Sequence, residues 1–201
     1  MSKDAVFSGE REVRTFVDLS HGSDVMMKLA QENERGSYYT AMSSLLLRAF
    51  TFEAYLNHLG SQKAEYWPEI DSIRVMYKYA VLCKMLSVSP DFSRRPYQTV
   101  GLLFKFRNAI AHGKSVVLKN SKDISSDDDP YKHIPKAAWE EYGTIENAER
   151  AKEDVSAMIV ELHKAAGLGD YPFVHGVGIA SLSLKPPSSS QQRIGQERPR
   201  R

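Results

Sequence analysis

The sequence predicts an all-α fold: an antiparallel bundle of four to five helices, followed by a disordered C-terminal tail. Apolar residues recur about every 3.6 positions over several long segments, which is the period of an amphipathic helix. Glycines and prolines stand at the ends of these segments, where helices stop or begin. No segment alternates apolar and polar residues convincingly enough to predict a sheet. Such helices are expected to pack around one core.

Two predicted helices open the bundle. A short one begins near Asp24, which could cap it, and Gly36 interrupts or ends it. A stronger one covers residues 37–59, with Gly60 as its expected C′ residue. Its apolar stripe includes one acid, Glu53. The stripe consists of Met42, Leu46, Ala49, Glu53 and Leu56.

Three further helices are predicted. One has Pro68 at its first position and runs to about Val88. The next covers 96–112, and Gly113 is placed to cap it. The last covers about 144–166. The face that the first of these three should bury consists of Ile70, Ile73, Met76, Tyr77, Ala80, Val81, Lys84 and Met85.

These elements suggest a division of the chain into three parts. Residues 1–23 are expected to form an N-terminal arm. Residues 24–170 would form the helical bundle, with an irregular insertion at 114–143. Residues 171–201 would form a flexible tail, because proline, serine and arginine replace the apolar pattern there.

Composition and charge narrow the functional class. Hydrophobic residues make up 42% of the 201 positions and charged residues 26%, as in ordinary soluble globular proteins. The formal net charge is +2, but residues 185–201 hold five basic residues and one acidic residue, or +4, so residues 1–184 sum to −2. The body is therefore not a broadly basic nucleic-acid binder. Any contact with nucleic acid must use a local cluster or the tail.

Membrane insertion, disulfides and metal binding are not predicted. No apolar run is long enough to span a bilayer, and the N-terminus lacks the apolar core of a signal peptide. We therefore expect a cytoplasmic protein without a membrane partner. The single cysteine, Cys83, excludes an intramolecular disulfide. No spacing of ligand residues fits a metal and no cofactor motif occurs, so we expect neither a metal nor a cofactor.

The most informative segment is the end of the 96–112 helix, where Arg107, Asn108 and His112 follow an apolar run. Asn108 and His112 are four positions apart, so they share a helix face. Arg107 and His112 differ by about 140° around the helix axis, but a long arginine side chain can bend back along the surface. The three polar groups can therefore converge on one small anion.

Purely structural roles for these residues stay open. A cation or histidine in the last helical turn is favoured by the helix dipole, by up to about 1 kcal/mol. An arginine beside a core can also simply extend to the surface. Glu53 would be costly as a lone carboxylate on an apolar stripe, which makes Arg107 its natural partner from another helix. Alternatively, Glu53 lies at the edge of its stripe and reaches water.

The segment Arg-Asn-Ala-Ile-Ala-His at 107–112 resembles the Arg-x(4–6)-His motif of the HEPN superfamily. These are small α-helical domains of toxin–antitoxin, phage-defence and RNA-processing systems. Asn108 fits the polar residue that often follows the arginine, and the helix around Glu53 is similar to the family's first core helix. The resemblance covers roughly 37–165. Some toxin members have a tyrosine shortly after the histidine, whereas Gly-Lys-Ser follows at 113–115 here.

The resemblance implies metal-independent RNA cleavage. His112 would act as general acid or base on the ribose 2′-hydroxyl, because imidazole titrates near neutral pH. Arg107 would hold the scissile phosphate and offset charge in the transition state. Asn108 would orient the phosphate or the imidazole. Family members commonly dimerise so that two motifs face one cleft, which implies a two-fold homodimer, and a toxin would have an antitoxin or other protein partner.

Three basic residues flank this helix, and they could line a path for RNA: Arg94, Arg95 and Lys114. Equally, they could be ordinary surface charges. The leading hypothesis is an HEPN-like endoribonuclease with a toxin or defence role. Two alternatives stay open: a noncatalytic helical module that binds RNA, a nucleotide or a protein, and a dimeric scaffold in which Arg107 and His112 serve stability alone.

Overall fold

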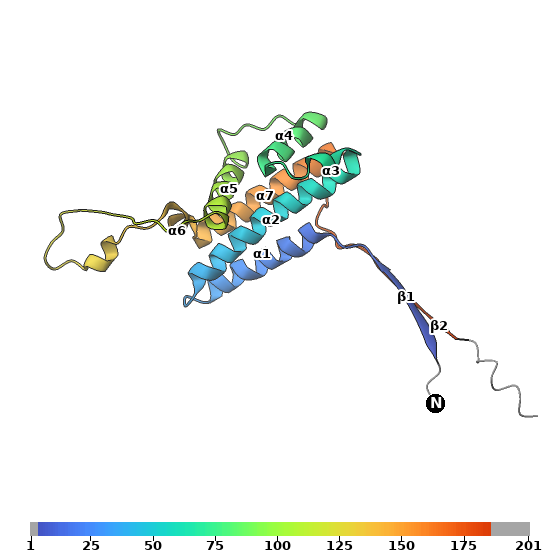
Figure 1. Cartoon of the computed structure of the whole chain (residues 1–201), viewed down its shortest axis with the longest axis horizontal. Coiled ribbons are helices and arrows are strands. Elements are labelled where there is room, and N and C mark those ends of the chain that lie inside the picture. Colours follow the sequence, from blue (N-terminus) through green and yellow to red (C-terminus); the bar gives the residue numbers. More distant parts are fainter. Residues whose placement is uncertain (1–3, 186–201) are drawn as a thin grey trace, which may run out of the picture. The chain divides into compact units, whose positions relative to one another are not determined.

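The computed structural model describes residues 4–185, which are mostly helical (Figure 1). These residues divide into two compact units. Residues 14–175 form a helical unit, and residues 4–13 together with 176–185 form a two-stranded ribbon. The all-α prediction is thus correct for most of the chain, but the ribbon was not predicted. The predicted disorder of 186–201 lies outside the described residues.

α2 (Ser37–Lys63) is the central helix of the helical unit. It packs against α1 (Thr15–Glu32), α4 (Val75–Met85), α5 (Tyr97–Ala111) and α7 (Ile145–Ala165). Burial of large apolar side chains stabilises such a core by about 1.5–3 kcal/mol each. The residues that α2 contributes include Leu45, Ala49, Phe52, Tyr55, Leu56 and Leu59.

The helices are not all antiparallel, which corrects the prediction. α1 and α2 form an antiparallel pair, but α2 and α7 run in the same direction (Figure 1). Lys63 Nζ at the end of α2 donates to the carbonyl of Ala166, directly after α7, at 2.8 Å. A long connection leads from α5 to α7 and returns to the neighbourhood of α5, since α6 packs against that helix (Figure 1). That connection contains a 3₁₀ turn, Pro130–His133, and the short helix α6, Ala138–Tyr142.

α1 begins at Thr15, well before the predicted start at Asp24. Phe16 and Val17 are buried in the core, and they anchor the first turn of the helix. Asp24 lies inside α1 rather than at its cap. Much of the predicted N-terminal arm is therefore helical.

Gly60 lies inside α2 rather than at its end, because α2 continues to Lys63. The indole of Trp67, the first residue of α3 (Trp67–Ile70), packs directly on this glycine. A Cβ at position 60 would lie only 2.1 Å from Trp67 Cε2. The predicted helix stop is therefore a packing site that only glycine can provide.

The single helix predicted from Pro68 to Val88 is broken in two. α3 has four residues and α4 starts at Val75, so a bend at 71–74 separates them. α4 also buries a different face from the predicted one, since Tyr77 is exposed and Lys78 is buried. The buried positions follow the i, i+3, i+4, i+7 spacing of a core-facing stripe: Val75, Lys78, Tyr79, Leu82 and Cys83.

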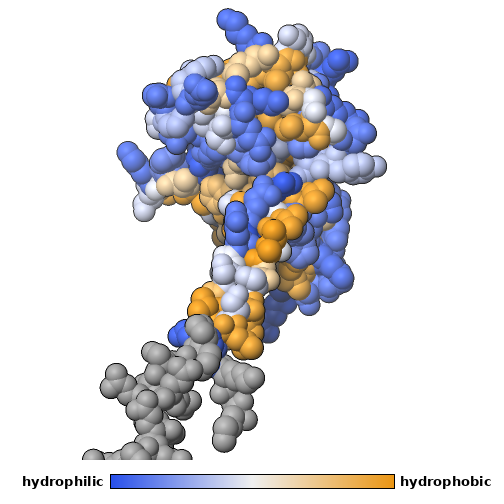
Figure 2. Space-filling view, turned by 90° about the vertical axis from the view of Figure 1, so that its right-hand side faces the viewer, coloured by the Kyte–Doolittle hydropathy of each residue, from blue (hydrophilic) through white to orange (hydrophobic). Residues whose placement is uncertain are grey.

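The ribbon pairs the two ends of the described chain. β1 (Ala5–Arg11) and β2 (Gly178–Leu184) are antiparallel, with Ala5 opposite Leu184. A strand therefore occupies part of the predicted flexible tail, 171–201. No hairpin signal joins these strands, since nearly the whole chain lies between them, and this is why local pattern missed them. Apolar side chains lie exposed on one ribbon face (orange in Figure 2), among them Phe7, Leu182 and Leu184.

Candidate functional site

A cavity of about 760 Å³ lies between the middle of α2, the start of α4 and the end of α5. The three predicted catalytic residues and the predicted supporting acid all line it. The complete lining is Glu53, Ser72, Ile73, Arg74, Val75, Met76, Tyr77, Phe104, Arg107, Asn108 and His112.

Arg107 is fixed by contacts with two helices. Its Nη2 donates to Glu53 Oε2 of α2 at 2.9 Å, and its Nη1 donates to Oδ1 of the adjacent Asn108 at 3.0 Å. The guanidinium carbon lies 5.5 Å from the centroid of the Phe50 ring, a cation–π contact. Each Nη keeps a second hydrogen for which no residue in 4–185 is the acceptor, so these hydrogens can bind a ligand.

Glu53 has two cationic neighbours, of which sequence reasoning found one. Besides Arg107, Lys78 Nζ of α4 lies 4.0 Å from Glu53 Oε1, and it donates to Asn57 Oδ1 at 2.8 Å. The Lys78 side chain is only 2% exposed. One negative and two positive charges therefore meet here, so Glu53 does not cancel the positive charge available at the cavity. The predicted buried face of the 68–88 helix did not include Lys78, which is buried because α4 starts at Val75.

Asn108 and His112 lie exposed at the C-terminal end of α5. The His112 backbone N–H donates to the Asn108 carbonyl at 3.0 Å, which closes the last turn. Within the described part of the chain, no residue hydrogen-bonds to the His112 imidazole. The ring is therefore free to exchange a proton with a ligand in the cavity.

A second part of the cavity lining was not predicted. Ser72, Arg74 and Tyr77 reach the cavity from the bend before α4 and from its first turn. In an unbroken helix from Pro68, these side chains would point in other directions. The sequence therefore did not predict that they line the cavity.

The three predicted RNA-contacting residues do not line the cavity. Arg95 forms a two-pronged ion pair with Asp154 of α7, at 2.8 and 2.9 Å, and these hydrogen bonds raise the pKa of Arg95. Arg94 pairs with Asp91 at 3.2 Å. Lys114 is exposed shortly after α5. Both arginines therefore contribute to ion pairs within the protein.

Residues 4–185 contain neither a helix that could span a membrane nor a group of metal-ligating side chains. No helix there combines the length and the apolar character that crossing a bilayer requires. No three side chains of His, Cys, Asp or Glu are grouped so as to hold a metal ion. Comparison of the chain with known protein families, with curated proteins and with solved structures found no match.

Proposed function

We propose that this protein is a metal-independent endoribonuclease of the HEPN type, with a role as a toxin or in phage defence. One observation carries the proposal: Arg107, Asn108 and His112 line one cavity, and Glu53 holds Arg107 there. A guanidinium with free hydrogens suits a phosphodiester. An imidazole without a protein partner suits proton transfer.

In the proposed reaction, the ribose 2′-oxygen attacks the adjacent phosphorus and the bond from phosphorus to the 5′-oxygen breaks. The products are a 2′,3′-cyclic phosphate and a 5′-hydroxyl. His112 takes the proton from the 2′-hydroxyl or delivers one to the leaving 5′-oxygen. Arg107 binds the non-bridging phosphate oxygens through its free Nη hydrogens, and this stabilises the charge that grows in the transition state. Asn108 orients the phosphate or the imidazole.

The proposal includes three partners. RNA is the substrate, and a second copy of the chain forms a two-fold dimer in which two motifs face one cleft. Two copies of His112 would then supply both proton transfers. An antitoxin or another protein partner would control the activity, and the protein would act in the cytoplasm.

An RNA-cleavage assay in the presence of EDTA tests the proposal. We expect His112→Ala to lower cleavage by about 10²- to 10⁴-fold, because general acid–base catalysis is lost. Arg107→Ala should lower it by about 10²- to 10³-fold, because charge stabilisation is lost. His21→Ala and Arg35→Ala are matched controls, since both residues are exposed outside the cavity, and they should cleave like wild type.

Equal cleavage by wild type and His112→Ala, or no cleavage by wild type, would refute the enzyme. RNA binding that weakens in Arg107→Ala without any cleavage would support the noncatalytic binding module. Lost thermal stability in both variants, with neither binding nor cleavage in wild type, would support the scaffold.

A further inference from the structure

The bend between α3 and α4 brings to the cavity groups that the proposed cleavage chemistry does not use. Residues 72–77 all line the cavity. Arg74 and Tyr77 are three positions apart at the start of α4, so they are close neighbours along one side of the helix. Both side chains are exposed.

Arg74 adds a second guanidinium to the cavity. None of the residues in 4–185 accepts a hydrogen bond from its side chain or forms an ion pair with it. Glu53 is the one acid in the cavity lining, and Arg107 and Lys78 already share it. A guanidinium that lines a cavity without a protein acceptor is suited to a phosphate.

Tyr77 offers a flat apolar surface at the same place. Its side chain is 60% exposed, whereas Tyr79 in the same helix is fully buried. The cavity lining beside it includes Met76 and Phe104. Nucleobases stack on exposed aromatic rings, and each such stack is worth roughly 5- to 150-fold in affinity.

The cavity is larger than one phosphate needs, since its volume lies within the range of about 300–1,000 Å³ that is usual for pockets of drug-sized ligands. We propose that Arg74 and Tyr77 form a second subsite, which binds the nucleotide next to the scissile phosphate. The base stacks on Tyr77, and Arg74 pairs with the phosphate of that nucleotide. A base must be unpaired to stack in this way. This inference rests on the proposed RNA binding at the cavity, but not on cleavage.

Binding of a fluorescein-labelled tetrauridylate with 2′-O-methyl groups tests the subsite, because this probe has no free 2′-hydroxyl and cannot be cleaved. Fluorescence anisotropy at several salt concentrations gives the affinity and its salt dependence. We expect Tyr77→Ala to weaken binding roughly 5- to 150-fold and Tyr77→Phe to bind like wild type. Tyr39→Ala is the matched control, since Tyr39 is 67% exposed and lies in the first turn of α2, outside the cavity lining.

The charge of Arg74 is tested by the salt dependence of the same binding. Arg74→Gln should reduce the slope of log affinity against log salt by about 0.7, the loss of one contact to a single strand. Arg35→Gln should leave the slope unchanged, because Arg35 is exposed outside the cavity.

Wild-type affinity in Tyr77→Ala, an unchanged slope in Arg74→Gln, or no binding of the probe by wild type at low salt would each overturn the subsite. If wild type binds the probe as expected but cleaves no RNA, the endoribonuclease fails and the subsite stands. If cleavage needs His112 but neither Arg74 nor Tyr77, the subsite fails and the endoribonuclease stands.

Discussion

Arg48 and Arg107 each pair with a carboxylate on another helix, yet their surroundings differ. Arg48 of α2 pairs with Asp24 of α1, and Arg107 of α5 pairs with Glu53 of α2. In both side chains Nε is buried and finds no hydrogen-bond partner within the described residues. The Arg48 side chain is 2% exposed, whereas that of Arg107 is 23% exposed.

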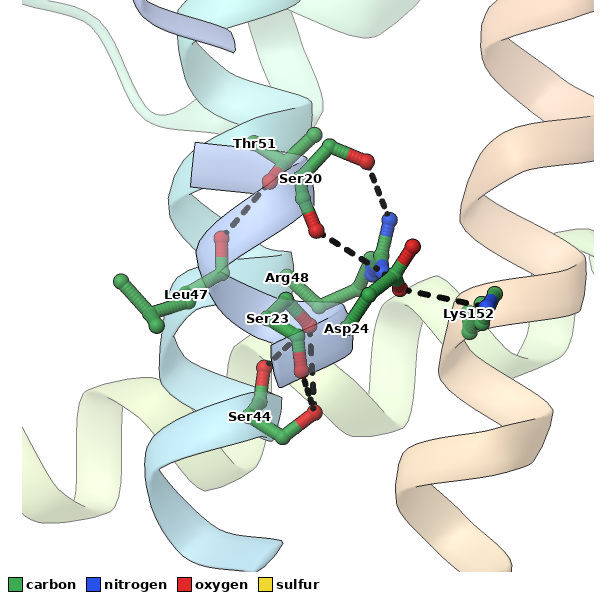
Figure 3. A network of polar contacts seen from close by, with 8 residues as sticks. All are labelled: Ser20, Ser23, Asp24, Ser44, Leu47, Arg48, Thr51 and Lys152. Atoms are coloured by element: carbon green, nitrogen blue, oxygen red, sulfur yellow. Dashed lines mark hydrogen bonds and ion pairs between the residues drawn. The ribbon is translucent and has the colours of Figure 1, made fainter. Parts of the chain in front are cut away.

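The Arg48 guanidinium is enclosed by protein groups (Figure 3). Nη1 donates to the Ser20 hydroxyl at 2.9 Å, and Nη2 donates to Asp24. Lys152 of α7 lies 3.4 Å from the same carboxylate, so the cluster joins three helices. Burial lowers the pKa of Arg48, and the nearby Asp24 carboxylate opposes this effect. Arg48 therefore serves the assembly of the fold.

Arg107 keeps free hydrogens and faces a cavity, although its residue type and its partner's charge match those of Arg48. Exposure and the number of protein acceptors therefore separate an arginine that stabilises the fold from one that can bind a ligand. Three variants test this distinction further.

The largest effect is expected at the ion pair between the buried Arg48 and the partly exposed Asp24. Asp24→Asn keeps the side-chain shape but removes the charge that balances Arg48. We expect the free energy of unfolding, measured by urea denaturation, to fall by about 3 kcal/mol, while probe binding by the folded protein is unchanged. Lys152→Ala is the control, since it removes only a half-exposed ion pair and should cost less than about 1 kcal/mol. Equal losses in the two variants would contradict the importance of the Arg48 pair.

A smaller effect is expected from removal of the positive charge of Lys78, which lies beside Glu53. Lys78→Met leaves Arg107 and Glu53 as a neutral pair, so binding of the 2′-O-methyl probe should weaken about tenfold, equal to roughly 1.4 kcal/mol. Adding Glu53→Gln restores one net positive charge, so the double variant should bind more tightly than Lys78→Met alone. If it binds no better, Lys78 acts through packing rather than through charge.

The smallest effect is expected at His163. Its contact with Tyr55 is between neutral groups, unlike the ion pairs of Arg48 and Arg107. His163 Nδ1 lies 3.1 Å from the hydroxyl oxygen of the buried Tyr55. Burial, and secondarily Arg14, lower the pKa of His163. The unfolded chain therefore binds this proton more readily than the folded protein. The contribution of His163 to the free energy of unfolding is therefore fully present above the ordinary histidine pKa of about 6.5. It is lost as the pH falls through that value toward the lowered pKa of His163 in the folded protein.

Urea denaturation at pH 7 and pH 5 measures this contribution. His163→Gln should lose less stability between the two pH values than wild type, whereas His21→Gln, an exposed control, should lose as much as wild type. An identical loss in all three proteins would mean that His163 titrates alike in both states.

Sequence reasoning found the part of the site that lies on one helix. Arg107, Asn108 and His112 follow one another on α5, and Glu53 was visible as an acid that interrupts an apolar stripe. Lys78 and Arg74 were missed because their role depends on where α4 begins. That position depends on contacts between helices rather than on a local pattern.

The same reason explains the errors in the fold. The long helices α2, α5 and α7 were predicted within a few residues, because their apolar stripes extend over many turns. Gly60 follows an apolar stripe as a helix stop would, but it lies inside α2 because the Trp67 ring packs on it. β1 and β2 pair although most of the chain lies between them in sequence, so no short window of sequence contains both strands.

The ribbon makes the protein suitable for circular permutation, in which the chain is joined at one place and opened at another. The Lys185 backbone N–H donates to the Asp4 carbonyl at 2.9 Å, so these two positions are neighbours. A short linker from Lys185 back to Asp4, in place of residues 186–201 and 1–3, would close the polypeptide into a ring. A new opening in the exposed segment 116–128 would then give a circular permutant with its helices in a new order along the chain. Trimming either strand, by contrast, would deprive the other of its backbone partners.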